Sequence, residues 1–322
     1  IVIYLSIYGI KTQKFNNEIT KNVLKINKKI NLSLNEVNYL LNPLNFSINI
    51  TAKNPKILLE DKSLDLRDVV SNISLKSFIN NQFSIDDLKI STKEIKIKDL
   101  ISLIRAVKGS PQLFVLDGIT KEGLISANIN LTFDLDGEVK NNYQINGTIK
   151  NAKISIYNQV EVDNLNLLFN ISNNQLILRE IETNLNSIKL KSPLIKIEKK
   201  KDIFFIDGKV ANDEQNFDID KLKPILGNLL NNIEIEKIDF NSINTFSFNV
   251  NKKLKLNDLK LETNLNLKIF KIVKNPFNLK PFLPNYTERI KFKNHKIKIK
   301  LSKDTLDVKG GGDIYIGDEL EQ

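Results

Sequence analysis

From Asn31 onward, apolar and polar residues alternate along the chain with a period of two. The clearest run is "LISANINLTFDLDGEV", residues 124–139. One face of this run carries Ile125, Ala127, Ile129, Leu131, Phe133 and Leu135, and the other carries Ser126, Asn128, Asn130, Thr132 and Asp134. Such alternation predicts an antiparallel strand with one buried and one solvated face, and Asp136-Gly137 predicts the turn that ends it. Similar runs over 146–158, 173–184, 244–267 and 296–310 predict a mainly β body.

A six-residue pattern recurs along this body: apolar, any, apolar, any, Asp/Glu/Asn, apolar. Its copies are LDLRDV (64–69), FSIDDL (83–88), IKIKDL (95–100), VEVDNL (160–165), LILREI (176–181) and LKLNDL (254–259). The apolar positions are the first, third and sixth, so the alternation shifts by one residue at the acidic or amide position. This shift predicts a β-bulge or a short turn, where that side chain can hydrogen-bond to backbone. The copies together predict similar hairpins laid edge to edge in one quasi-repetitive sheet.

Helical spacing interrupts the alternation in a few places. "FNNEITKNVLKINKKI" (15–30) predicts an amphipathic helix between the N-terminal segment and the body. "KDLISLIRAVKGSP" (98–111) predicts a helix that ends at Gly109 and Pro111. "DKLKPILGNLLNN" (220–232) predicts another short helix, and the Pro-rich "NPFNLKPFLPN" (275–285) predicts a loop or short turn. These short helices could cap the ends of the apolar face of a sheet.

The first ten residues, "IVIYLSIYGI", are apolar except for Ser6 and Gly9, and the chain contains no Met. Ten residues extend only about 15 Å as a helix, half of the hydrocarbon core of a bilayer. We interpret them as the end of a longer membrane anchor, because the Tyr side chains suit the level at which a helix leaves the membrane. The predicted anchor residues are Ile1, Val2, Ile3, Tyr4, Leu5, Ile7 and Tyr8. The alternative is the first buried strand of a soluble domain.

Charge does not point to nucleic acid. The net charge is +10 over 322 residues, which is compatible with anionic partners. The lysines, however, are scattered at alternate positions, as in "KNHKIKIKLSK" (293–303), and no arginine cluster occurs. A nucleic-acid interface concentrates basic residues on one element. We therefore interpret the lysines as the solvated faces of strands.

The sequence contains no recognisable catalytic constellation. Cysteine is absent, which excludes disulfides and thiolate metal sites. A single histidine, His295, is interpreted as a surface residue because it has no partner for triad or metal chemistry. Residues 134–138, "DLDGE", are interpreted as a hairpin turn rather than a calcium loop, and Gly310–Gly312 as a bend or bulge. We expect no enzymatic activity, no metal and no cofactor.

A sheet with one apolar face must cover that face. It can fold onto a second sheet as a sandwich, close on itself, or curl into a groove that shields an apolar ligand. The periodicity alone does not choose among these arrangements.

The chain resembles the AsmA-like family of bacterial envelope proteins, the TamB- and YhdP-type proteins, over most of residues 30–320. The resemblance rests on the apolar N-terminal segment, the recurring IKIKDL-type steps and strand ends such as "FFIDGKV" (204–210). Residues 147–184 are most similar to the family. Residues 267–273 and 283–317 are similar to its YhdP-type members.

The resemblance implies an inner-membrane protein, crossing once, with an elongated curled antiparallel sheet in the periplasm. That β-groove would carry phospholipid between the inner and outer membranes, with outer-membrane or periplasmic proteins as further partners and no nucleic acid. The implied parts are the anchor (1–10), a linker helix (11–30), a first groove segment (31–211) and a second (212–322). The candidate groove residues are Ile125, Ile129, Leu131, Phe133, Leu135, Leu167, Phe169, Leu176, Leu178, Phe246 and Phe248. The alternative is a non-catalytic structural or assembly factor of the envelope with a closed sandwich core.

Overall fold

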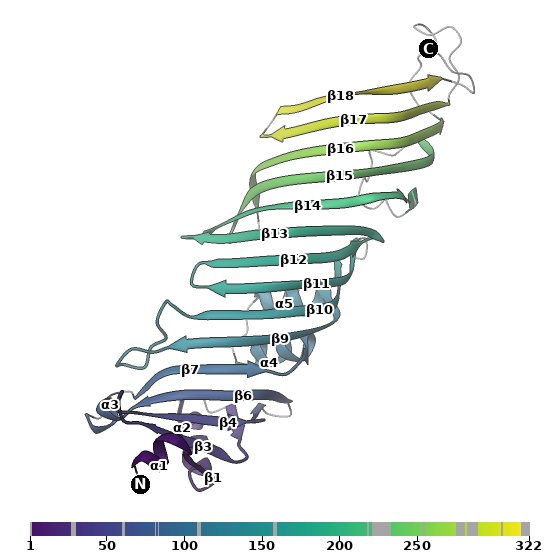
Figure 1. Cartoon of the computed structure of the whole chain (residues 1–322). Helices are drawn as coiled ribbons and strands as arrows, with labels where there is room; N and C mark the ends of the chain where they lie inside the picture. The colour runs from purple at the N-terminus through teal and green to yellow at the C-terminus, as the bar shows by residue number, and fades with distance from the viewer. Residues whose placement is uncertain are drawn as a thin grey trace. The chain divides into compact units, whose positions relative to one another are not determined.

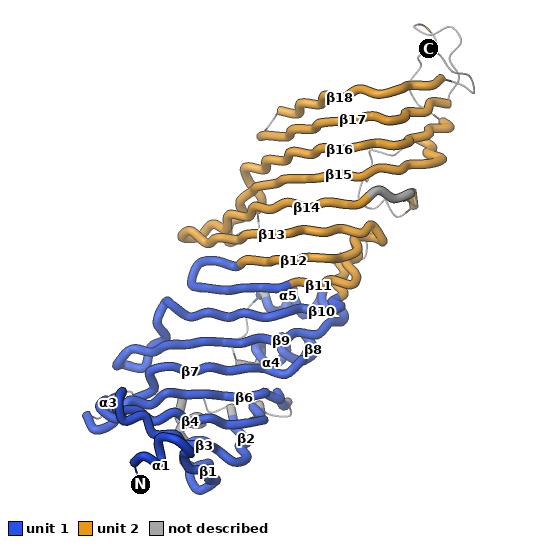
Figure 2. The backbone as a smooth tube through the Cα atoms, viewed as in Figure 1, with its two compact units in different colours: residues 1–152, 168–176 blue, residues 153–167, 177–322 orange. Residues whose placement is uncertain are grey.

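The structure is a computed structural model. It describes residues 2–26, 30–59, 62–80, 82, 84–107, 111–156, 160–217, 219–220, 233–253, 255–274, 281, 289–303 and 305–316. Within these residues the chain is mainly β, and its 18 strands belong to one antiparallel sheet that is not closed. This confirms the predicted mainly β class and the antiparallel sheet. The chain divides into two compact units, residues 1–152 with 168–176 and residues 153–167 with 177–322 (Figure 2).

Unit 1 begins with a short helix, α1 (Val2–Ile7), and a short strand, β1 (Ile10–Thr12), before helix α2 (Asn16–Ile26). The linker predicted as helix over 11–30 is thus confirmed for its central part, but it starts in β1, which pairs with β3. Among the described residues, no helix is both long and apolar enough to cross a membrane.

The sheet of unit 1 is a series of antiparallel neighbours (Figure 1). Strand β3 (Val37–Asn42) pairs with β4 (Ser47–Lys53), β4 with β6 (Lys62–Ser74), β6 with β7 (Ile85–Thr92), and β7 with β9 (Thr120–Thr132). Strand β2 (Ile30–Ser33) pairs with β5 (Lys56–Leu59), and β5 pairs with the start of β6. The two-residue strand β8 (Ile95–Lys96) pairs with β9. Three further strands, β10 (Gln144–Ile156), β11 (Val160–Ser172) and β12 (Gln175–Leu185), contribute residues to both units.

Three further helices belong to unit 1. Helix α3 (Leu75–Ile79) follows β6, and its N-cap Ser74 accepts a hydrogen bond from the Ser77 amide. Helix α4 (Ile97–Val107) confirms the helix predicted over 98–111, and its Ile101 is buried. Helix α5 (Pro111–Ile119) was not predicted. A proline is compatible with the end of one helix, but it also favours the first turn of a new helix because its fixed φ is helical and it needs no N–H partner there.

The other strands of unit 2 are β13 (Ile188–Lys200), β14 (Ile203–Phe217), β15 (Glu234–Asn251), β16 (Leu256–Lys274), β17 (Ile290–Ser302) and β18 (Thr305–Ile316). Each pairs antiparallel with the next. The predicted boundary between residues 211 and 212 falls inside β14. The helix predicted over 220–232 lies outside the described residues except for Asp220, and the loop predicted over 275–285 lies outside them except for Pro281.

The recurring six-residue pattern forms bulges, as predicted. The β6–β7 pairing slips across Arg67 in LDLRDV, and again across Asp86 in FSIDDL, where the Asp86 carbonyl accepts from the Phe133 amide instead. In the other strand copies the fifth residue has a left-handed backbone: Asn164 (φ 51°), Glu180 (φ 51°) and Asp258 (φ 50°). Left-handed residues are typical of bulges and turns. The copy IKIKDL differs, because β8 gives way there to helix α4.

Candidate functional site

The apolar face of unit 1 is built from rows of cross-strand partners. One row consists of Val37, Ala52, Val69, Ile90 and Ile129, and the next consists of Tyr39, Ile50, Ser71, Leu88 and Leu131. The candidates Ile129 and Leu131 therefore lie on one face with apolar residues of β3, β4, β6 and β7. Ile125 faces Ile95 of β8. These three candidates are half-buried.

Two other candidates lie where strand β9 ends. Phe133 forms an isolated bridge with Val139. Leu135 lies in the following turn with 56% of its surface exposed, so its assignment to the apolar face of the strand was wrong. The turn itself confirms the prediction for 134–138: the Asp134 carboxylate accepts from the amides of Asp136 and Glu138, and Gly137 has a φ of 85°. The side-chain bonds bend the chain out of the alternation before Leu135 is reached.

Of the candidates on β11 and β12, Phe169 has the clearest surroundings. A Cβ atom at Gly147 of β10 would lie 2.4 Å from Phe169 Cζ, so the ring occupies the space that a larger residue would fill. Leu167 is buried, and Leu176 and Leu178 are half-buried. Phe169 and Leu176 belong to unit 1, and Leu167 and Leu178 belong to unit 2.

The apolar face of unit 2 has the same construction with more aromatic rings. Its clearest row consists of Gly208, Phe246, Leu261, Leu301 and Leu306. Phe248 faces Ile206, and the Phe246 and Phe248 rings are 5.9 Å apart. Stacked pairs also join Phe217 to Phe240 at 4.3 Å and Phe270 to Phe292 at 5.8 Å. The face thus carries aromatic rings on β14, β15, β16 and β17.

This face is covered only in part. Among the described residues of β13–β18, the buried apolar side chains are Phe217, Leu267 and Ile290. Phe246 and Phe248 are half-buried, as are their apolar neighbours Ile206 and Leu261. A strand face packed against a second layer would hold mostly buried side chains. The apolar face of unit 2 therefore keeps apolar surface in contact with water.

A polar cluster interrupts this apolar face. Ser242 Oγ donates to Asn212 Oδ1 (2.5 Å) and accepts from Asn244 Nδ2 (2.9 Å), and Thr263 Oγ1 donates to Asn244 Oδ1 (2.8 Å). Asn212 Nδ2 also donates to the Phe240 carbonyl (3.2 Å). Asn212, Ser242 and Thr263 are buried. Sequence reasoning missed this cluster, although polar residues at apolar positions of the alternation were a usable signal.

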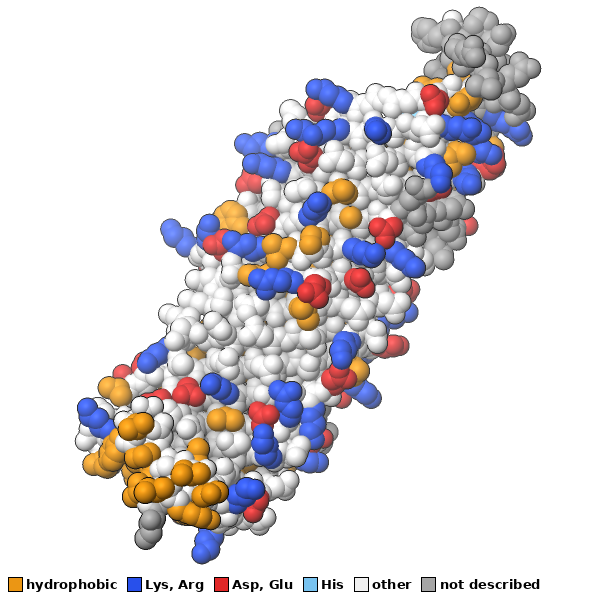
Figure 3. All heavy atoms as spheres, in the orientation of Figure 1, with side chains coloured by type: hydrophobic (Ala, Val, Ile, Leu, Met, Phe, Trp, Pro, Cys, Tyr) orange, Lys and Arg blue, Asp and Glu red, His pale blue; other side chains and the backbone are white. Residues whose placement is uncertain are grey.

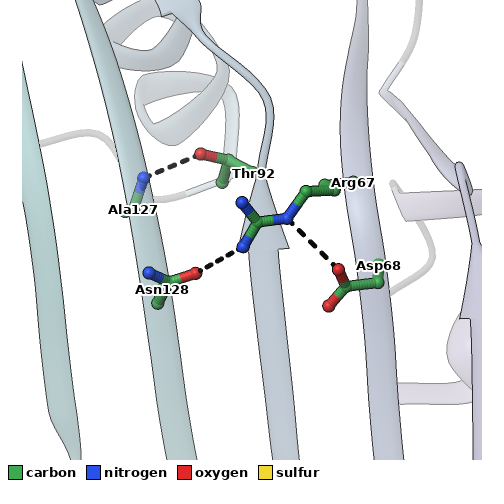
Figure 4. Close-up of polar contacts among 5 residues, drawn as sticks. All are labelled: Arg67, Asp68, Thr92, Ala127 and Asn128. Carbon is green, nitrogen blue, oxygen red and sulfur yellow. Dashed lines mark hydrogen bonds and ion pairs between the residues drawn. The ribbon is translucent and has the colours of Figure 1, made fainter.

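The opposite face carries charged and amide side chains. In unit 1, the bulge places Arg67 so that its Nη2 donates to Asn128 Oδ1 (3.1 Å) and its Nε pairs with Asp68 (3.2 Å) (Figure 4). Thr92 Oγ1, at the end of β7, accepts from the Ala127 amide (2.8 Å), so a side chain replaces the ladder acceptor there. Figure 3 shows acidic and basic side chains interspersed over the visible surface. Exposed ion pairs of this kind contribute about 0–1 kcal/mol each.

The pKa shifts in unit 2 come from such exposed neighbours. A hydrogen bond from Lys298 lowers the pKa of Glu262, and the Lys298 and Lys300 charges act in the same direction. The neighbouring Lys293 and desolvation lower the pKa of Lys291. In the described part of the chain, no group of three or more acidic or histidine side chains could hold a metal ion. Nothing in these clusters combines burial with a converging set of reactive groups.

His295, interpreted from the sequence as a surface residue, is half-buried. Its Nδ1 lies 2.8 Å from the Lys293 carbonyl, and its ring packs edge-on against Phe292. The β17–β18 pairing slips between Lys293 and Lys296, and a Cβ at Gly312 would lie 2.4 Å from His295 Nδ1. The bulge predicted near Gly310–Gly312 is therefore present, but the extra residue lies in β17, and Gly312 gives the histidine ring its space.

The predicted anchor residues lie at one end of unit 1. Val2, Ile3, Tyr4, Ile7 and Tyr8 are exposed and Leu5 is half-buried, while Ile1 lies outside the described residues. Gly9 has a φ of 67°, and a Cβ there would lie 2.6 Å from the Tyr39 carbonyl oxygen. This glycine allows the chain to leave α1 and pair with β3 immediately.

Comparisons with known proteins add no identification, because no family model, curated protein or solved structure matches the chain.

Proposed function

We propose that this chain is a membrane-anchored, periplasmic lipid carrier that moves phospholipid between the inner and outer membranes of a bacterium along its sheet. The observation that supports this proposal is the apolar face that continues over successive strands and is covered only in part. In unit 2 the rows run from β14 to β18. The resemblance to AsmA-like proteins supplies the compartment and the membranes in the proposal.

The dimensions of the face suit acyl chains. Neighbouring strands are about 4.8 Å apart, and an acyl chain covers half of a hydrocarbon core about 30 Å thick. One acyl chain laid along a cross-strand row would therefore cover about three strands. Each square ångström of apolar surface taken out of water contributes about 25 cal/mol. A face of this kind holds lipid without a specific polar contact and can pass it from row to row.

The polar cluster of Asn212, Ser242, Asn244 and Thr263 is compatible with this use. Its hydrogen bonds are made among its own side chains and neighbouring carbonyls. An apolar chain passing over it would leave those bonds intact. No step of the proposed transport requires a reaction, so directionality must come from membrane partners.

The test is native mass spectrometry of the chain, exported to the periplasm of a bacterial expression host and purified gently. Several co-purifying phospholipids per chain are expected. A photo-crosslinking residue at Phe246 should label lipid, whereas the same residue at Ile243, on the opposite face of β15 and 43% exposed, should not. Lipid-free protein, or equal labelling from both positions, would contradict the proposal.

A structural or assembly factor is the second candidate, and one observation favours it. Strand β18 is exposed along almost its whole length, including Leu306 and Val308, and among the described residues it pairs only with β17. Unpaired strand edges accept a partner strand by β-addition. Lipid-free protein with a partner segment crosslinked to β18 would support this candidate instead.

A further inference from the structure

Three short segments with exposed apolar side chains meet at one end of unit 1. They are α1 with the following Tyr8, the β3–β4 turn at residues 43–46, and α3. Together they are called the apolar tip. Figure 3 shows hydrophobic side chains gathered at the N-terminal end, where Figure 1 places α1 and α3. The exposed members are Val2, Ile3, Tyr4, Ile7, Tyr8, Leu44, Phe46, Phe78 and Ile79.

The strand register explains why these segments meet. Ile10 faces Tyr39 and Thr12 faces Val37, so the chain before Ile10 runs toward the end of β3, where the turn begins. Ser47 at the start of β4 faces Ser74, the residue before α3. The Leu75 amide also donates to the Phe46 carbonyl (3.0 Å), which ties the turn to the helix. Strand pairing and this hydrogen bond therefore fix the three segments of the tip next to one another.

The apolar side chains of the tip are exposed to solvent and do not pack into a core. Leu44 is 95% exposed and Phe78 is 66% exposed. Phe46 has a φ of 48°, a left-handed conformation that is uncommon for an aromatic residue, in a turn that leaves its ring exposed. Contiguous exposed apolar surface of this kind is typical of membrane or partner contact.

We propose that the apolar tip docks on the surface of a lipid bilayer, with the β3–β4 turn and α3 inserting beside α1. This proposal deepens the lipid-carrier function and rests on it for the source of the lipid. The three segments carry one charged side chain, the exposed Lys76, and the first lysine after α1 is the exposed Lys11 of β1. Lysines beside apolar side chains complement anionic headgroups, tyrosine suits the headgroup level, and phenylalanine and leucine suit the acyl boundary just below it. A second copy of the chain would instead have to bury these lysines.

The first experiment is vesicle flotation with the full chain, using phosphatidylcholine vesicles with and without phosphatidylglycerol. The double variant Leu44→Gln, Phe78→Gln should bind at least about tenfold more weakly. Its matched control is Phe205→Gln, Ile243→Gln in unit 2; these side chains are 38% and 43% exposed and lie on the opposite face of β14 and β15 from Ile206 and Phe246. Unchanged binding by the tip variant would overturn the proposal, and so would absence of binding by the wild type.

A second experiment, tryptophan fluorescence, uses a substitution that keeps the tip apolar. Because the chain contains no Trp, Leu44→Trp introduces a single fluorophore, whose emission should shift to the blue when the vesicles are added. Ile243→Trp, on the opposite face of β15 from Phe246 and 43% exposed in the wild type, should not respond. A shift at Leu44→Trp without vesicles that grows with protein concentration would identify a second copy as the occupant and overturn the proposal. Phospholipid that co-purifies with the Leu44→Gln, Phe78→Gln variant should remain at the wild-type level, which separates docking from carriage on the sheet.

Discussion

The buried polar cluster of unit 2 gives the sharpest test of the structure. Ser242 is 5% exposed, and its hydroxyl makes one hydrogen bond to Asn212 and one to Asn244. Ser242→Ala removes both bonds and leaves Asn212 Oδ1 without its partner in an apolar environment. A net hydrogen bond contributes about 1 kcal/mol, and an orphaned buried acceptor costs about 1–3 kcal/mol. The substitution should therefore lower the free energy of unfolding by about 2–3 kcal/mol.

The double variant Asn212→Leu, Ser242→Ala separates hydrogen bonding from packing. It removes the acceptor together with the donor, so its loss of stability should be clearly smaller than the sum of the two single losses. Urea denaturation measures these energies, and hydrogen exchange of the β14 and β15 amides locates the effect. Thr245→Ala, at an exposed position on the opposite face of β15, is the control and should be nearly neutral. Ser242→Ala within about 0.5 kcal/mol of wild type, or strictly additive effects, would refute the reasoning.

Substitutions at three further positions test other parts of the fold. Leu66 is 1% exposed, so Leu66→Ala should lower the free energy of unfolding by about 2–5 kcal/mol, measured by thermal unfolding. A decrease below about 1 kcal/mol would contradict its place in the core. Glu180→Gly should stabilise the chain by about 0.5–1 kcal/mol in urea because φ is 51°, whereas Glu180→Val should destabilise it; the reverse order would exclude the left-handed bulge. The pKa of Glu262 is lowered in the folded chain, so its carboxylate stabilises the fold at pH values above the ordinary pKa of 4.5. This stabilisation is lost as the pH falls from 4.5 through the lowered pKa. The urea midpoint of wild type should then fall more steeply with acid than that of Glu262→Gln, and parallel curves would disprove the pairing with Lys298.

The local pattern predicted local structure well. Alternation identified the strand over 124–132. The six-residue pattern located the bulge at Asp258 and, one residue before the predicted position, those at Arg67 and Asp86, because such features depend on residues adjacent in sequence. Predictions were wrong where neighbouring segments compete. Leu135 continues the alternation, but the Asp134 side chain forms the turn first. Pro111 resembles a helix end, yet it begins α5.

The sequence was enough to predict which candidate residues share an apolar face, but not which residues of other strands lie next to them. The alternation of apolar and polar residues is visible in the sequence, and its period of two was enough to assign Ile129, Leu131, Phe246 and Phe248 to an apolar face. Which strands lie side by side, and therefore the cross-strand rows, the polar cluster and the apolar tip, could be learned only from the folded chain. The physical reason is that register is set by pairing between distant segments, as when Ile10 faces Tyr39 and Ser47 faces Ser74. Period two determines the face on which each side chain lies, whereas the pairing decides which side chains it contacts.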